Sequence, residues 1–159
     1  MGIAIFPAPV AGSKTAFRTM LTSGTSYTVP AGVTYLNVTL QGGGGGGSTN
    51  QTLGVEGNGR GGETVVSTLS ATAGASIAYT IGAGGAASGR YGNGSAGGTT
   101  TFTGATSAAG GAGGQQVTGS YSPAASNISF ANNGGQGAAA NPCDGKAGGS
   151  GYIIVEYWA

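Results

Sequence analysis

The chain has 159 residues, of which 37 are Gly and 5 are Pro, and a share of about a quarter for these two types is typical of low-complexity disorder. Val, Ile, Leu and Phe together number only 25, which also favours disorder. A net charge of +1, however, provides almost no self-repulsion to keep the chain expanded, so the low apolar content alone does not make the chain disordered. With no His, one Cys and four carboxylates, the composition excludes most enzymes, so we expect no catalytic residue, no metal site and no cofactor.

Residues 1–16 form an apolar first segment. It lacks the basic start of a signal peptide, and Pro7 and Pro9 interrupt it. A terminus this apolar would promote non-specific association if it were exposed. We therefore expect it to be an anchoring arm that is buried against a partner subunit. The anchoring side chains would be Ile3, Ile5, Phe6 and Val10. Residues 17–159 are then expected to form a single domain.

Short alternating runs predict strands, and no apolar pattern of helical period persists for three turns. The clearest strand covers residues 34–41, where Leu36, Val38 and Leu40 share one face. Residues 76–81 form a second strand, with Ile77, Tyr79 and Ile81 on its buried face. Further strands are expected at 26–29, 63–69, 99–103, 127–130 and 152–158.

Two of these strands carry more specific expectations. The sequence VPAGV at 29–33 suits a type I turn that joins strands 26–29 and 34–41 into an antiparallel hairpin. The run YIIVEYW at 152–158 has few polar positions, so it is central in its sheet or covered on both faces near its end. The fold class is therefore all-β, a small antiparallel β-sandwich with long glycine-rich loops.

Five glycine-rich stretches separate the strands, at 42–47, 54–62, 82–98, 104–114 and 134–151. Ordering Gly is costly in backbone entropy, so ordered stretches must pair their backbone groups. Partial threefold spacing, as at Gly145, Gly148 and Gly151, aligns Gly on one side of an extended helix with three residues per turn. This spacing indicates packing as polyglycine II-like helices.

Several binding motifs are incomplete in this chain. The strings at 57–62, 82–87 and 92–97 match the glycine pattern of dinucleotide-binding loops, but no Asp or Glu occurs between Glu63 and Asp144. The five basic residues are scattered singly, so we expect no nucleic-acid partner. No apolar run approaches the ~20 residues of a membrane helix, so we expect no membrane insertion.

Aromatic and amide side chains in the glycine-rich stretches are the candidate contacts with another molecule. An aromatic face flanked by amides can stack on a sugar ring or an apolar receptor patch. Phe130 alternates with Ile128 and is expected in the core instead. The candidate receptor-binding residues are Arg90, Tyr91, Asn93, Ser120 and Tyr121.

Four strings together carry a family resemblance: YTVPAGVTYLNVTLQGGGGGG, the strand ending in IGAGG, TTTFTGATSAAGGAGG, and GGSGYIIVEYW. The chain resembles the glycine-rich domain of bacteriophage tail-fibre and related virion surface proteins. The resemblance implies a small β-sandwich whose glycine-rich loops project, in some members as a polyglycine II lattice with tips that touch the host cell. It also implies a place on the virion surface after assembly in the bacterial cytoplasm.

The expected function is therefore that of a non-enzymatic virion structural protein of the tail fibre or tail tip. Its partners would be other virion subunits, through the N-terminal arm, and a host glycan or outer-membrane protein. We expect a homo-oligomer, a trimer as is common in fibres. One alternative is a capsid decoration or head-fibre protein that stabilises the shell. Another is ice binding, through a regular surface that includes Thr99, Thr101 and Thr103.

Overall fold

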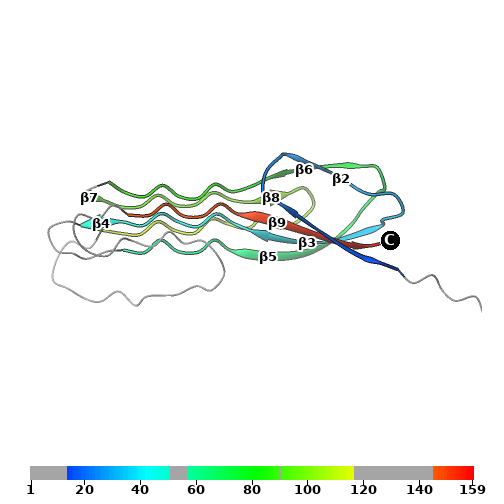
Figure 1. The fold of residues 1–159 in the computed structure, drawn as a ribbon, viewed down its shortest axis with the longest axis horizontal. Coiled ribbons are helices and arrows are strands. Elements are labelled where there is room, and N and C mark those ends of the chain that lie inside the picture. The colour runs from blue at the N-terminus through cyan, green and yellow to red at the C-terminus, as the bar shows by residue number, and fades with distance from the viewer. Residues whose placement is uncertain (1–13, 51–56, 90, 117–144) are drawn as a thin grey trace, which may run out of the picture.

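A computed structural model describes residues 14–50, 57–89, 91–116 and 145–159 of the chain (Figure 1). Within these ranges the fold is all-β, as the sequence predicts, and contains no helix. No described segment could therefore cross a lipid bilayer as a helix. The strands are β1 (Ala16–Leu21), β2 (Ser26–Thr28), β3 (Tyr35–Gln41), β4 (Thr49–Asn50), β5 (Thr64–Ser70), β6 (Ser76–Thr80), β7 (Tyr91–Gly92), β8 (Thr101–Phe102) and β9 (Tyr152–Trp158).

Two antiparallel sheets form a small sandwich at one end of the molecule (Figure 1). The larger sheet has the strand order β1-β9-β3-β5, and the smaller has the order β2-β6-β8. A further two-stranded ladder joins β4 to β7 at the opposite end. The run YIIVEYW is β9, which lies between β1 and β3, so the predicted central position is confirmed.

The core lies between the two sheets. Leu36, Val38 and Leu40 of β3 are fully buried, which confirms the face predicted from their alternation. The smaller sheet contributes an aromatic cluster, in which the Phe102 ring lies 6.2 Å from that of Tyr27 and 6.3 Å from that of Tyr79. Ile77 and Ile81 pack against this core while partly buried, so the predicted inner face of β6 is correct.

The predicted hairpin between strands 26–29 and 34–41 is wrong. β2 pairs with β6, whereas β3 pairs with β5 and β9 in the other sheet. The turn between β2 and β3 closes from Val33 N to Pro30 O, and Gly32 occupies its third position with a φ of 79°. This geometry is typical of a type II turn rather than type I. The chain therefore crosses from one sheet to the other at this turn, and the apolar side chains of both strands enter the shared core.

Strand β1 was not predicted, because its sequence AFRTML does not alternate between apolar and polar residues. Five of its six residues are exposed, and among the described strands it pairs only with β9. Just before β1, Thr15 and Ala159 exchange backbone hydrogen bonds of 2.9 and 3.1 Å. The predicted arm residues Ile3, Ile5, Phe6 and Val10, and the predicted strand 127–130 with Phe130, lie outside the described residues.

Candidate functional site: a glycine-rich bundle and its tip

Six extended segments leave the sandwich side by side and form an elongated bundle, which we call the glycine bundle (Figure 1). Residues 42–48 are its central segment and are buried along their whole length. Five outer segments surround them, namely 57–63, 82–88, 92–98, 109–115 and 145–151.

The central segment donates hydrogen bonds with a period of three. Gly42, Gly43 and Gly44 donate their N–H groups to three different outer segments, at Glu63, Gly98 and Gly149 respectively. Gly45, Gly46 and Gly47 repeat the pattern on Arg60, Ser95 and Lys146 of the same segments, with N···O distances of 2.8–2.9 Å. Such a repeat requires three residues per turn, which is the geometry of a polyglycine II-like helix.

The carbonyl groups of the central segment accept hydrogen bonds from two further outer segments. The N–H groups of Gly85 and Ser88 bind the carbonyls of Gly44 and Gly47, and those of Gly111 and Gly114 bind the carbonyls of Gly43 and Gly46. The outer segments also bind one another, as from Gly97 N to Gly111 O and from Gly148 N to Gly85 O, both within 2.9 Å. The bundle is therefore held by a three-dimensional network of backbone hydrogen bonds in place of an apolar core.

Glycine is required in the bundle because the backbones are in contact. A Cβ atom at Gly45 would lie under 3.0 Å from the carbonyl group of Ala112, and one at Gly46 would collide in the same way with Ala86. Gly148 and Gly151, part of the predicted threefold series, face Gly44 and Gln41 equally closely. The predicted polyglycine II-like packing of the glycine-rich stretches is thus present, and its spacing has a steric cause.

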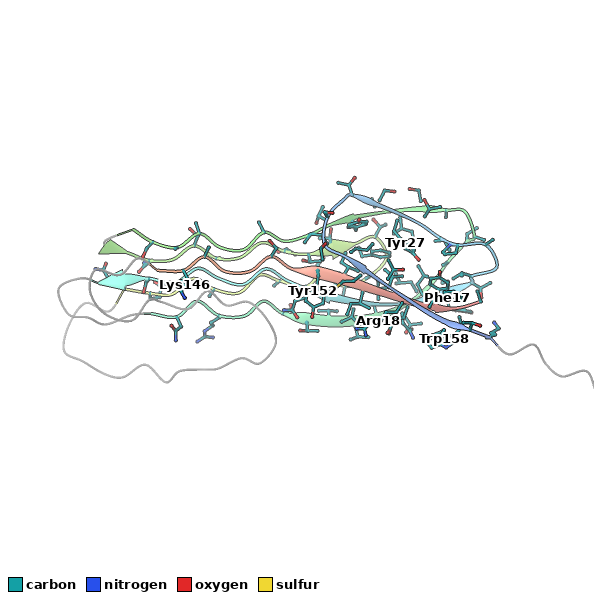
Figure 2. The ribbon with its side chains drawn as sticks, viewed as in Figure 1. Phe17, Arg18, Tyr27, Lys146, Tyr152 and Trp158 are labelled. Atoms are coloured by element: carbon teal, nitrogen blue, oxygen red, sulfur yellow. The ribbon has the colours of Figure 1, made fainter. Side chains whose placement is uncertain are left out.

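Apart from the buried Ser48, most residues with side chains lie on the outside of the bundle. In segments 82–88 and 109–115 the exposed positions recur every third residue, at Ala83 and Ala86 and at Ala109 and Ala112. Lys146 and Arg60 are also exposed there, and Figure 2 labels Lys146 on the bundle. Within the described ranges no group of three metal-ligating side chains comes together. The bundle thus presents small side chains and a few charged ones on a backbone fixed by hydrogen bonds.

Buried hydroxyl and amide groups connect the bundle to the sandwich. The Thr100 hydroxyl donates to the Gln41 carbonyl at 2.6 Å and accepts from Gly82 N at 3.0 Å. The Gln41 amide in turn donates to Gly62 O at 2.8 Å. Near the other end, the Ser48 hydroxyl accepts from Gly57 N at 2.9 Å and donates to Gln115 O at 3.0 Å. None of these residues was singled out from the sequence, because an isolated Thr, Gln or Ser beside a glycine run has no distinguishing pattern.

The end of the bundle farthest from the sandwich is its tip, where β4 pairs with β7 (Figure 1). Tyr91 belongs to β7 and is paired with Asn50 in the ladder. Asn93 is exposed nearby, and its side-chain oxygen accepts a hydrogen bond from Gln116 N at 2.6 Å. The structure therefore places two predicted binding residues at the tip. The other three, Arg90, Ser120 and Tyr121, lie outside the described residues.

A two-sheet sandwich that extends into a hydrogen-bonded glycine bundle defines the class of this protein as a glycine-rich β-structural domain. The sequence profile of the glycine-rich domain family matches residues 20–152, and the chain belongs to that family. No curated protein matches the chain in a sequence comparison.

Proposed function

We propose that this chain is a non-enzymatic surface protein of a bacteriophage virion, in the tail fibre or tail tip, that presents the tip of its glycine bundle to the host cell. The observation that carries the proposal is the separation of two poles along one long axis (Figure 1). Thr15 and Ala159 pair at the sandwich pole, and β4 pairs with β7 at the bundle pole. An attachment at the first pole leaves the second facing outward.

The chemistry of the tip suits recognition by surface contact. Asn93 is exposed there, two residues after Tyr91 of β7. Because the backbone beneath them is fixed by hydrogen bonds, such groups bind a partner at a low cost in conformational entropy. The partner we propose at this pole is a glycan or an outer-membrane protein of the host. Other virion subunits are proposed to bind the arm at residues 1–16.

Cryo-electron microscopy of the particle that carries this chain tests the location. A position at the distal end of a tail appendage, with the tip outward, is the expected result. A position on the capsid lattice, or in a joint between subunits, would instead support the decoration function.

Adsorption measurements test the binding residues. Tyr91→Ala combined with Tyr121→Ala is expected to abolish adsorption to host cells without changing the unfolding midpoint. Phe17→Ala, which removes a half-exposed aromatic ring from β1 in the sandwich, is the matched control and should leave adsorption intact. Unchanged adsorption in the double variant would refute the tip as the binding surface.

Deletion of residues 1–12 tests the arm. The truncated protein should fold and be absent from purified particles, because the apolar anchor is lost. Retention of the truncated protein on particles would refute the anchoring role.

A further inference from the structure

The larger sheet has one face toward the core and one face away from it, which we call the outer face. Its members follow from the strand registers and from the alternation of side chains along each strand. Figure 2 shows two of them, Arg18 and Trp158, on the side of this sheet away from Tyr27. The outer face includes Arg18 and Met20 of β1, Ile154, Glu156 and Trp158 of β9, Tyr35, Asn37 and Thr39 of β3, and Val66 and Thr68 of β5.

This face carries most of the large apolar side chains that the described part of the chain exposes. Met20 is 57% exposed, Tyr35 62%, Val66 71% and Trp158 47%. These four residues come from all four strands of the sheet. They lie in two rows, Met20 with Val66 and Trp158 with Tyr35, on either side of a polar row that runs from Arg18 through Glu156 and Asn37 to Thr68. Met, Trp, Tyr and Arg are the residue types enriched in protein interfaces, so the outer face has the composition of an interface.

The charges on the face cancel. Arg18 and Glu156 lie side by side on β1 and β9, with Nε and Oε1 3.5 Å apart. A partner with a net charge of either sign would gain nothing from this pair. The face therefore suits a partner surface that carries no net charge.

The arrangement of the apolar residues is self-complementary. Met20 and Val66 lie in one row across the sheet, at its two edges. The pairs that make up this row are Met20 with Ile154, Ile154 with Thr39, and Thr39 with Val66. Trp158 and Tyr35 lie two residues beyond the Glu156–Asn37 pair, on the two central strands. Consider a two-fold axis that runs parallel to the strands, between β9 and β3. It places a residue on one side of the axis opposite the residue of the same row that lies on the other side of the axis in a second copy.

We propose that the outer face binds the outer face of a second copy of this chain about this two-fold axis. Met20 then faces Val66 of the second copy, and Trp158 faces its Tyr35. Glu156 faces Asn37 of the second copy, whose side-chain amide is a hydrogen-bond donor for a carboxylate. Two flat sheets packed in this way are about 10 Å apart, as in a β-sandwich.

The axis also keeps the two molecules parallel. It runs along the strands, so both glycine bundles point the same way and both sandwich poles lie together. A three-fold axis, which a trimer needs, would set three flat faces at about 60° to one another, and no face would then be covered along its whole width. The face measures roughly 20 Å by 20 Å, which is small for a stable interface, so the association is expected to be weak and concentration-dependent.

Sedimentation equilibrium of the full chain over a concentration series tests the stoichiometry. We expect a monomer–dimer equilibrium that Val66→Asp shifts to monomer by at least tenfold in the dissociation constant. Lys146→Asp, which places the same side chain at an exposed position on the bundle, is the control and should dimerise like the unchanged chain. A monomer at all concentrations, a trimer, or a dimer indifferent to Val66→Asp would overturn the proposal.

Thiol cross-linking tests which residues face each other. In a Cys143→Ser background, Met20→Cys and Val66→Cys are made as separate variants and treated with a short bis-maleimide. Each variant alone has its two cysteines at opposite edges of the dimer and should stay uncross-linked, whereas the equimolar mixture should give a covalent dimer. Phe17→Cys, on the other side of β1, replaces Met20→Cys in the control mixture. Absence of the product in the first mixture, or equal yield in the control, would overturn the proposed orientation.

Discussion

The hydroxyl of Thr100 donates a hydrogen bond to the carbonyl oxygen of Gln41, at 2.6 Å, where the two sheets meet the glycine bundle. The same hydroxyl accepts from Gly82 N at 3.0 Å, so one side chain connects β3, the start of segment 82–88 and the residue before β8. All three residues are buried, so this contact lies inside the junction between the sandwich and the bundle.

Substitution of Thr100 by Val should therefore destabilise the protein although the side chain keeps its shape. The N–H of Gly82 loses its acceptor in a buried position, which costs about 1–3 kcal/mol. Denaturant unfolding measures the change. Thr101→Val is the matched control, because the Thr101 hydroxyl binds the Thr80 hydroxyl at an exposed position, and it should cost under about 0.5 kcal/mol. Equal effects would show that the buried hydrogen bonds do not stabilise the junction.

Substitution of Gly45 by Ala should be among the most damaging single changes. Its methyl group would overlap the carbonyl of Ala112, and a backbone carbonyl held by a lattice cannot move aside cheaply. We expect a loss of at least about 3 kcal/mol in the free energy of unfolding. Gly89→Ala is the control, since a Cβ there meets no atom within 4 Å, and it should stay within about 1 kcal/mol of the unchanged protein. If Gly45→Ala were tolerated, the backbones of Gly45 and Ala112 could not be in close contact in the folded protein.

Amide hydrogen exchange should be slowest in the central segment. The N–H groups of residues 43–47 are each hydrogen-bonded and buried, so they exchange only when the bundle opens. In β1, the pairing of Thr15 with Ala159 directs the N–H groups of Ala16, Arg18 and Met20 away from β9, and these should exchange fast. Exchange monitored residue by residue checks both expectations. Fast exchange at residues 43–47 would contradict a lattice that persists in solution.

Stability should fall at alkaline pH through Tyr27. Burial, with a smaller contribution from Tyr157, raises the pKa of Tyr27 above its ordinary value of 10.0. The folded protein therefore holds this proton more tightly than the unfolded chain, so the stabilisation is fully present below pH 10 and is lost as the pH rises through the folded-state pKa. Denaturant unfolding at neutral pH and above pH 10 measures the loss, and Tyr27→Phe should reduce it. A Tyr27→Phe variant with the same alkaline loss would assign the effect to other groups.

The strands that face the core could be predicted from the sequence, because a period of two in a half-buried strand is a local pattern. β3 and β9 were placed to within one residue, and the central position of β9 followed from its lack of polar positions. The need for close backbone contact in the glycine stretches was also visible in their threefold spacing. Likewise, the composition itself determined that an ordered chain must depend on backbone pairing, since so few large apolar residues are present.

Partner choice was decided only by the tertiary structure. The local sequence of Ser26–Thr28 does not specify that this strand pairs with β6 rather than with β3, because the alternation shows only which side chains face the core. β1 is held by its register on β9, with Phe17 stacked on Tyr157 at 5.2 Å, and its own sequence has no strand period. The roles of Thr100 and Gln41 and the convergence of the outer-face residues likewise arise from segments far apart in the chain. The local periodicity of a strand indicates which of its sides is buried. Which strand it pairs with depends on contacts between segments far apart in the chain, and these cannot be predicted from one segment alone.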